Sequence, residues 1–132
     1  GSPALAGNPL KPGNWLARFL ALGARVDFIA VHWYKGVNAD RFIGDMQAIC
    51  SAYRLPVWVT EFAPQTVAQA RADPRKYSEA QVERFMRAAT AWMDASPCIR
   101  RYAWHDAKQG SSALFEGGQL TAAGRSYASV GR

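Results

Sequence analysis

Only two cysteines, Cys50 and Cys98, occur in the 132 residues, and neither has a partner at the spacing of metal ligands. We therefore expect no zinc site. In a parallel β/α layout both cysteines would lie at the amino-terminal end of the strands, away from any chemistry. They form a disulfide if the protein is secreted, or remain two buried thiols. The sequence leaves both alternatives open.

Several other features are missing. No apolar run approaches the roughly 18 residues of a membrane span, and no signal peptide is visible. The chain has no Gly-rich phosphate loop and no serine in a nucleophile-elbow pattern. The net charge is +6, but the basic residues are scattered and their longest run is Arg100-Arg101. Because diffuse charge favours solubility more than nucleic-acid recognition, we expect neither a nucleic-acid nor a membrane partner.

The apolar fraction of 49% is ample for a core, and residues 1–132 make up one domain or part of a larger one. Strands are predicted at 26–33, 56–62 and 99–105. Helices are predicted at 14–23, 38–53, 78–95 and 121–129, with caps at Asn38, Ser78 and Thr121. Residues 64–77 and 105–120 are expected to be long loops, the second holding a small hairpin. Strands separated by helices require parallel crossovers, so the sequence predicts an α/β fold.

The most informative segment is 55–63 (LPVWVTEFA), a short apolar run typical of a buried parallel strand. Strict alternation places Val57, Val59 and Glu61 on one face, and Trp58, Thr60 and Phe62 on the other. A carboxylate at the end of a buried strand is unfavourable unless it is paired or used. Glu61 is therefore either an ion-pair partner or a catalytic carboxylate, since active sites of α/β sheets lie at this end.

Two further strands also end in polar or aromatic residues. The first leads into His32, Trp33 and Tyr34, and the third into Trp104 and His105. If His32 faces the same interior as Glu61, Phe28 and Ala30 fill the layers below it, and Trp33 points outward to the helices. His32 is then a site residue instead of a structural histidine, Tyr34 lies at the rim, and Trp104 forms an aromatic floor. His105 either joins the site or anchors the loop that follows.

Four stretches together carry a family resemblance: 26–34 (VDFIAVHWY), 56–63 (PVWVTEFA), 101–104 (RYAW) and 118–127 (GQLTAAGRSY). In this order and spacing they resemble glycoside hydrolase family 128, whose members are (β/α)₈ barrels that cleave β-1,3-glucans with retention. The resemblance implies that Glu61 is the nucleophile at the end of strand seven. It also implies sugar-binding or orienting roles for His32, Tyr34, Trp104 and His105, no metal or organic cofactor, and a secreted or periplasmic location.

The resemblance covers only the second half of a barrel, which needs about 250 residues. It implies that residues 1–4 end strand five and that the chain supplies strands five or six to eight. The family's acid/base glutamate lies in an Asn-Glu-Pro motif, which this chain lacks. The other glutamates considered, Glu79, Glu83 and Glu116, are not at strand ends. We therefore expect the C-terminal half of a (β/α)₈ glycosidase, of endo or exo type, active only with the missing half.

Two rival functions remain. One is a non-catalytic glucan-binding or structural half-barrel, which the absent acid/base favours, and the other is a retaining hydrolase of a different β-linked polysaccharide. A half-barrel also exposes sheet edges and an inner face, expected to carry Val57, Val59, Phe28 and Tyr102. Exposed edges and apolar surface favour association, so the expected partner is a complementary N-terminal half-barrel or a homodimer mate.

Overall fold

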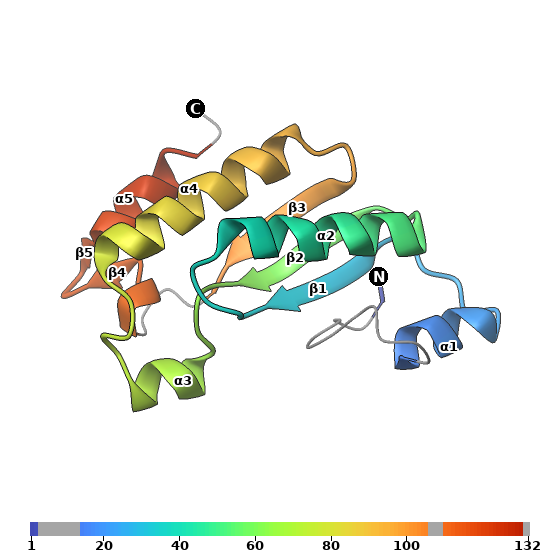
Figure 1. The fold of residues 1–132 in the computed structure, drawn as a ribbon, viewed down its shortest axis with the longest axis horizontal. Helices are drawn as coiled ribbons and strands as arrows, with labels where there is room; N and C mark the ends of the chain where they lie inside the picture. Colours follow the sequence, from blue (N-terminus) through green and yellow to red (C-terminus); the bar gives the residue numbers. More distant parts are fainter. Residues whose placement is uncertain (3–13, 106–109, 131–132) are drawn as a thin grey trace.

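The structure, a computed structural model, describes residues 1–2, 14–105 and 110–130. Its elements run in the following order (Figure 1): α1 Trp15–Ala21, β1 Ile29–Trp33, α2 Ala39–Tyr53, β2 Val57–Phe62, α3 Val67–Ala72, α4 Glu79–Ala95, β3 Ile99–Trp104, a 3₁₀ turn η1 Gly110–Ser112, β4 Phe115–Glu116, β5 Gln119–Leu120 and α5 Ala122–Ala128. No helix in these ranges is long and apolar enough to cross a membrane.

The three predicted strands form one parallel sheet in the order β1-β2-β3. Their carboxyl ends meet at one edge, as parallel pairing requires. The predicted hairpin in the segment 105–120 is also present, as the antiparallel pair β4 and β5. The expectation of a parallel α/β fold is therefore confirmed.

The helices begin where the capping residues predicted. Asn38 accepts a hydrogen bond from the Arg41 backbone at the start of α2, and Ser78 forms a capping box with Gln81 at the start of α4. The Thr121 side chain accepts a hydrogen bond from the Gly124 backbone at the start of α5. The expectation that residues 64–77 form a loop without a helix was wrong. They contain α3, which opens with a second capping box, between Thr66 and Gln69.

The core lies between the sheet and the two long helices. Figure 1 shows α2 and α4 on the same side of the sheet, with α5 beside α4. Trp33 projects into this layer, where its ring meets Phe42 edge-on at 5.2 Å and stacks on Phe85 at 5.4 Å. Its expected direction, toward the helices, is confirmed. The buried face of α2 is formed by Phe42, Met46 and Ile49.

The expected alternation along β2 was wrong at its carboxyl end. β1 pairs with β2 through Val31 and Val59, and then through His32 and Glu61. Thr60 is therefore an extra residue, a β-bulge, and a bulge shifts every later side chain to the opposite face. As a result Glu61 lies on the face away from α2 and α4, which we call the second face.

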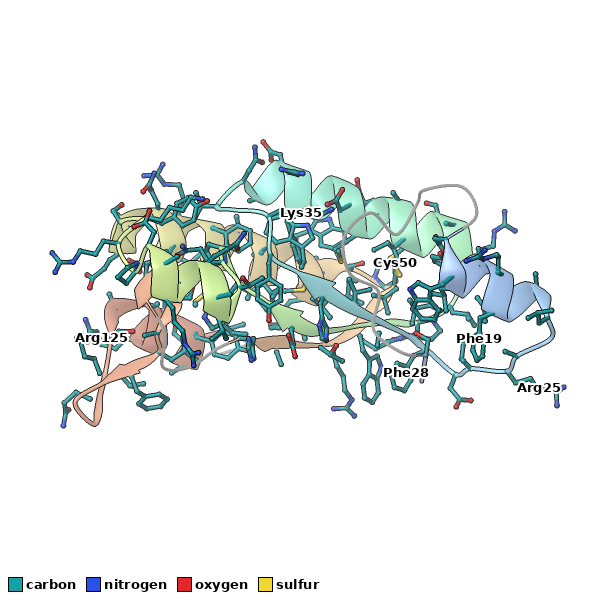
Figure 2. The ribbon with its side chains drawn as sticks, turned by 90° about the horizontal axis from the view of Figure 1, so that it is seen from below. Phe19, Arg25, Phe28, Lys35, Cys50 and Arg125 are labelled. Carbon is teal, nitrogen blue, oxygen red and sulfur yellow. A yellow bond between two sulfur atoms is a disulfide. The ribbon has the colours of Figure 1, made fainter. Side chains whose placement is uncertain are left out.

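The inner-face residues expected from alternation also need correction. Val57 and Val59 are fully buried in the core beneath the helices. Tyr102 also faces the helices, since its hydroxyl donates to Asp94 of α4 at 2.7 Å. Phe28 is on the second face as predicted, and Figure 2 shows it projecting away from the sheet on the side opposite α2.

Residues 1 and 2 lie beside β1. The Ser2 backbone N–H donates to the Phe28 carbonyl at 3.0 Å, and the Ala30 N–H donates to Ser2 Oγ at 3.0 Å. That residues 1–4 end strand five, as the resemblance implies, stays a prediction, and these two bonds place Ser2 where such a strand would run. Pro3 and Ala4 lie outside the described residues.

The structure resolves the alternatives for the two cysteines. Cys50, near the end of α2, and Cys98, just before β3, form a disulfide across a sequence separation of 48 residues. Cys50 is labelled in Figure 2. The bond joins α2 to the start of the third strand, at the end of the sheet remote from Glu61.

Reduction of this disulfide is expected to lower the free energy of unfolding by about 2–4 kcal/mol, because the bond restricts the unfolded chain more than the folded one. Urea unfolding with and without dithiothreitol measures the effect. A Cys50→Ala/Cys98→Ala variant is the control, since its stability should match that of the reduced protein and should not respond to dithiothreitol. Equal stability of the oxidised and reduced wild type would contradict the prediction.

Candidate active site

The Glu61 carboxylate lies at the carboxyl edge of the sheet, in contact with a tyrosine and a histidine. The Tyr34 hydroxyl donates to Glu61 Oε2 at 2.5 Å, and His32 Nδ1 lies 3.3 Å from the same oxygen. The Glu61 and His32 side chains are 32% and 29% exposed, so the group is sheltered but within reach of solvent. The structure therefore brings together three of the residues that the sequence singled out.

His105 completes the network from the third strand. Its Nδ1 lies 2.7 Å from the Tyr34 hydroxyl oxygen, and the two rings meet edge-on at 6.0 Å. An ionised carboxylate only accepts hydrogen bonds, so Tyr34 donates its proton to Glu61 and its oxygen accepts from His105 Nδ1–H. The His105 backbone N–H also donates to the Phe62 carbonyl at 3.1 Å, which holds the residue against β2.

Trp104 is not part of this group. It follows alternation on β3, so it faces the helices while His105 faces Glu61. Its ring is 7% exposed, lies 5.0 Å edge-on from Phe62, and donates its indole N–H to the Ser112 carbonyl at 2.8 Å. The expected aromatic floor beside Glu61 is therefore not what the structure shows. In this position the ring offers little surface to a sugar.

Sequence reasoning missed an ion pair that anchors the segment after β1. Lys35 Nζ and Trp33 Nε1 both donate to Asp45 Oδ2 of α2, at 2.7 and 2.9 Å. Burial raises the pKa of Asp45, but the hydrogen bonds from Lys35 and Trp33 outweigh it and hold the pKa below its usual value. Because Tyr34 lies between these two donors in sequence, the pair fixes the backbone that carries it.

A second group that the sequence did not reveal ties the loops together. Gln65, nearly fully buried, donates through Nε2 to the carbonyl of Gln69 within α3 and to that of Asp73, the residue that caps its carboxyl end. Ser111 Oγ of η1 donates to Gln65 Oε1 at 3.2 Å. The connection after β2 is thus joined to the one after β3, above the strand ends. A glutamine directly after a strand end carries no sequence signal for such a role.

The other glutamates are placed elsewhere. Glu79 and Glu83 belong to α4, and Glu116 lies in the hairpin. Ser126 and Arg87 donate hydrogen bonds to Glu83, and these bonds hold the pKa of its carboxyl below the usual value. Within the described ranges no group of three or more His, Cys, Asp or Glu residues could hold a metal ion.

The geometry suits a carboxylate that acts in one fixed orientation. The Tyr34 hydroxyl and the His32 imidazole both meet one oxygen of Glu61, and these contacts restrict the rotation of its side chain. The strands around it are parallel and the loops above them are joined, so the carboxylate faces the region where α/β enzymes hold their ligands. Such a group can serve as a nucleophile or as a general base.

Two comparisons relate the chain to known proteins. A family model described as the glycosyl hydrolase catalytic core matches residues 1–127. Alkali-sensitive linkage protein 1 of Schizosaccharomyces pombe is 30% identical over 106 residues, which are 79% of this chain and 18% of that protein.

Solved structures of glycoside hydrolase family 128 superpose well. An endo-β-1,3-glucanase from Amycolatopsis mediterranei, crystallised as a mutant with laminaripentaose, gives a TM-score of 0.84 at 31% identity, covering 98% of this chain and 57% of that one. A curdlan-specific exo-β-1,3-glucanase from Blastomyces gilchristii gives 0.72 at 30% identity, covering 98% and 53%. An oligosaccharide-binding protein from Trichoderma gamsii gives a TM-score of 0.75, covering 96% of this chain and 49% of that one. At 24% identity this likeness shows the fold alone.

The chain thus spans little more than half the length of the first of these structures and a smaller share of the curated relative. The family match nevertheless extends over nearly the whole chain, including all three strands and the residues at their ends. The chain belongs to the glycosyl hydrolase catalytic core family, and within it to glycoside hydrolase family 128.

Proposed function

We propose that this chain is the C-terminal half of a (β/α)₈ domain that hydrolyses β-1,3-glucan with retention, and that Glu61 is its nucleophile. The observation that carries the proposal is the Glu61 carboxylate, which is held by Tyr34 and His32 at the carboxyl edge of a parallel sheet. The β-1,3-glucanases among its structural neighbours support the substrate class.

The half-barrel follows from the sheet and its surroundings. Three parallel strands with helices on one face only are what a closed eight-stranded barrel looks like when it is cut. On the second face Arg101 and Ala103 are exposed. The 57% coverage of the Amycolatopsis enzyme is consistent with a little more than half of a barrel. The complementary half belongs to the same polypeptide or to a second one.

In the proposed mechanism a Glu61 oxygen attacks the anomeric carbon as the bond to the leaving sugar breaks. This forms a glycosyl-enzyme ester, which water then hydrolyses. Tyr34 and His32 orient the carboxylate, and His105 holds Tyr34 in place. The ring edges of His32, Tyr34 and His105 are also proposed to contact the sugar hydroxyls.

The leaving oxygen needs a proton from a second carboxylic acid, which lies roughly 5–5.5 Å from the nucleophile in a retaining enzyme. This chain has no Asn-Glu-Pro motif to supply it. Glu79, Glu83 and Glu116 are on α4 and in the hairpin, so we propose that the acid/base glutamate comes from the missing half. Alone, the chain should be nearly inactive, since losing general acid help lowers the rate by about 10²–10⁴-fold.

The main alternative is a glucan-binding half-barrel without catalysis. The missing acid/base glutamate favours it. The observation against it is the oriented carboxylate, because binding a neutral sugar does not require a glutamate held by both a phenol and an imidazole. Hydrolysis of another β-linked polysaccharide remains the second alternative.

The first test replaces the nucleophile. In the assembled protein, with both halves present, Glu61→Gln should abolish hydrolysis of laminarin-type β-1,3-glucan while preserving oligosaccharide binding, since the amide keeps the shape but cannot attack carbon. Reducing-end release measures turnover, and NMR of the product anomer measures stereochemistry. Glu116→Gln, in the exposed hairpin, is the matched control and should retain full activity.

Three outcomes bear against this mechanism. Undiminished hydrolysis by Glu61→Gln would remove Glu61 from the chemistry, and an inverted product would remove the retaining mechanism. Absence of turnover in the assembled wild type, with oligosaccharide binding intact, would favour the binding half-barrel.

The second test concerns Tyr34. Tyr34→Phe removes the hydroxyl that joins Glu61 to His105, and it should lower kcat by about 10–10²-fold, the value of one hydrogen bond to a charged group. The fall in kcat should exceed any rise in KM for laminari-oligosaccharides, because Tyr34 is proposed both to orient Glu61 and to contact the sugar. Tyr77→Phe, in the segment before α4, is the control. A variant with unchanged kcat would show that Tyr34 does not orient the carboxylate.

The third test separates packing from sugar binding at Trp104. Trp104→Phe should lower the free energy of unfolding by about 1–3 kcal/mol, because it leaves a cavity next to Phe62 and deprives the Ser112 carbonyl of its donor. Urea unfolding and titration with laminaritriose measure the two properties. Unchanged stability with weakened binding would instead place the Trp104 ring against the sugar.

A further inference from the structure

A row of side chains that the active site does not use crosses the second face. The rings of Phe28 and Trp58 are stacked, with centroids 3.8 Å apart and planes 11° from parallel. The guanidinium carbon of Arg101 lies 5.2 Å from the centroid of the Trp58 ring. We call Phe28, Trp58 and Arg101 the stacked row. Gly1 lies against its far end, where a Cβ would collide with the Phe28 ring.

The stacked row is not built to bind a sugar. Trp58 on β2 has Phe28 on the β1 side and Arg101 on the β3 side, so both of its faces are in use. Stacking on a sugar requires a free aromatic face. The row is also below the site, since Trp58 lies three residues before Glu61 on the same strand. Its form suits the packed interior of a closed barrel.

An unpaired charge is strongly disfavoured in the interior of a closed barrel. In this structure Arg101 is exposed, and within the described ranges its guanidinium forms no ion pair. An exposed cation over an indole ring gains only modestly from that contact. Once water is removed, a guanidinium needs a carboxylate and further hydrogen bonds to offset its lost hydration.

Room for such a partner exists beside the row. A hollow of 230 Å³ lies over β2 and β3 and is lined by Trp58, Thr60, Arg101 and Ala103, among others. Its lining is mainly apolar, and the Arg101 guanidinium is the charged group in it. A side chain entering from the opposite wall of the barrel would therefore meet one cation within an apolar wall.

We propose that the stacked row is a docking surface for the complementary half-barrel, and that this half places an aspartate or glutamate against Arg101. The proposal rests on the half-barrel of the preceding section. Three observations support this occupant: coverage of 57% of the Amycolatopsis enzyme, the half-buried aromatic rings of the second face, and the charge of Arg101. The ion pair would form across the seam between the halves, one layer below the catalytic carboxylate.

The test measures association of this chain with the complementary half, expressed as a separate polypeptide, by isothermal titration calorimetry. Arg101→Leu should weaken the complex by about 10²–10³-fold, because it leaves the partner's carboxylate buried without a cation. Arg101→Lys should recover part of the loss. Arg100→Leu, on the neighbouring exposed arginine, is the matched control and should bind as the wild type does.

Acid provides a second readout. Pairing with Arg101 lowers the pKa of the partner's carboxyl group in the complex. The ion pair therefore contributes fully to affinity above the pKa of the unpaired carboxyl, about 4, and this contribution is lost as the pH falls further. Between pH 6 and pH 3 the wild-type complex should therefore weaken more steeply than the Arg101→Leu complex. Parallel pH profiles would overturn the proposed ion pair.

Failure of this proposal is distinguishable from failure of the proposed function. Equal affinity of Arg101→Leu and wild type, or no association of the wild type with the other half, would overturn the docking proposal. Glu61→Gln should associate normally yet not turn over, whereas Arg101→Leu should turn over normally when saturated with the complementary half. If Glu61→Gln remained active while association still depended on Arg101, only the proposed role of Glu61 would be overturned.

Discussion

The β-bulge at Thr60 is the constraint on which both the core and the site depend. With strict alternation Glu61 would share a face with Val57 and Val59, and its carboxylate would lie in the apolar layer under α2 and α4, where an unpaired charge is strongly disfavoured. The extra residue lets β2 present valines to the helices and then turn the glutamate away. Thr60 Oγ1 donates to the Val31 carbonyl at 3.3 Å, which secures the bulge against the neighbouring strand.

Parallel pairing does the rest of the positioning. Because the three strands run in one direction, the residues that follow them reach the same edge, and Tyr34 meets Glu61 and His105 from either side of β2. The Lys35–Asp45 ion pair fixes the segment after β1 to α2. Gln65 joins the segment after β2 to the segment after β3. The carboxylate is therefore oriented by elements whose backbones are themselves held, as a preorganised site requires.

Sequence signals predicted correctly those features that depend on interactions between residues close in sequence. Asn38, Ser78 and Thr121 cap the helices that they predicted, since a capping bond involves residues three apart. Thr66 and Gln69 carried the same signal for α3, which the length of the loop obscured. Trp33 was placed correctly from alternation alone. Trp104 was not, because its position at a strand end suggested the site, whereas alternation on β3 places it opposite His105, against Phe62.

By itself, the sequence determined the parallel α/β fold, the family, and the strand ends that carry Glu61, His32, Tyr34 and His105, because hydrophobic period and residue order are properties of the chain. The tertiary structure alone decided which face each side chain occupies. A one-residue bulge moves every later side chain of the strand to the other face of the sheet. It is stabilised by hydrogen bonds between strands that are distant in sequence. It likewise decided that Cys50 and Cys98 are bonded, since that depends on the approach of α2 to β3.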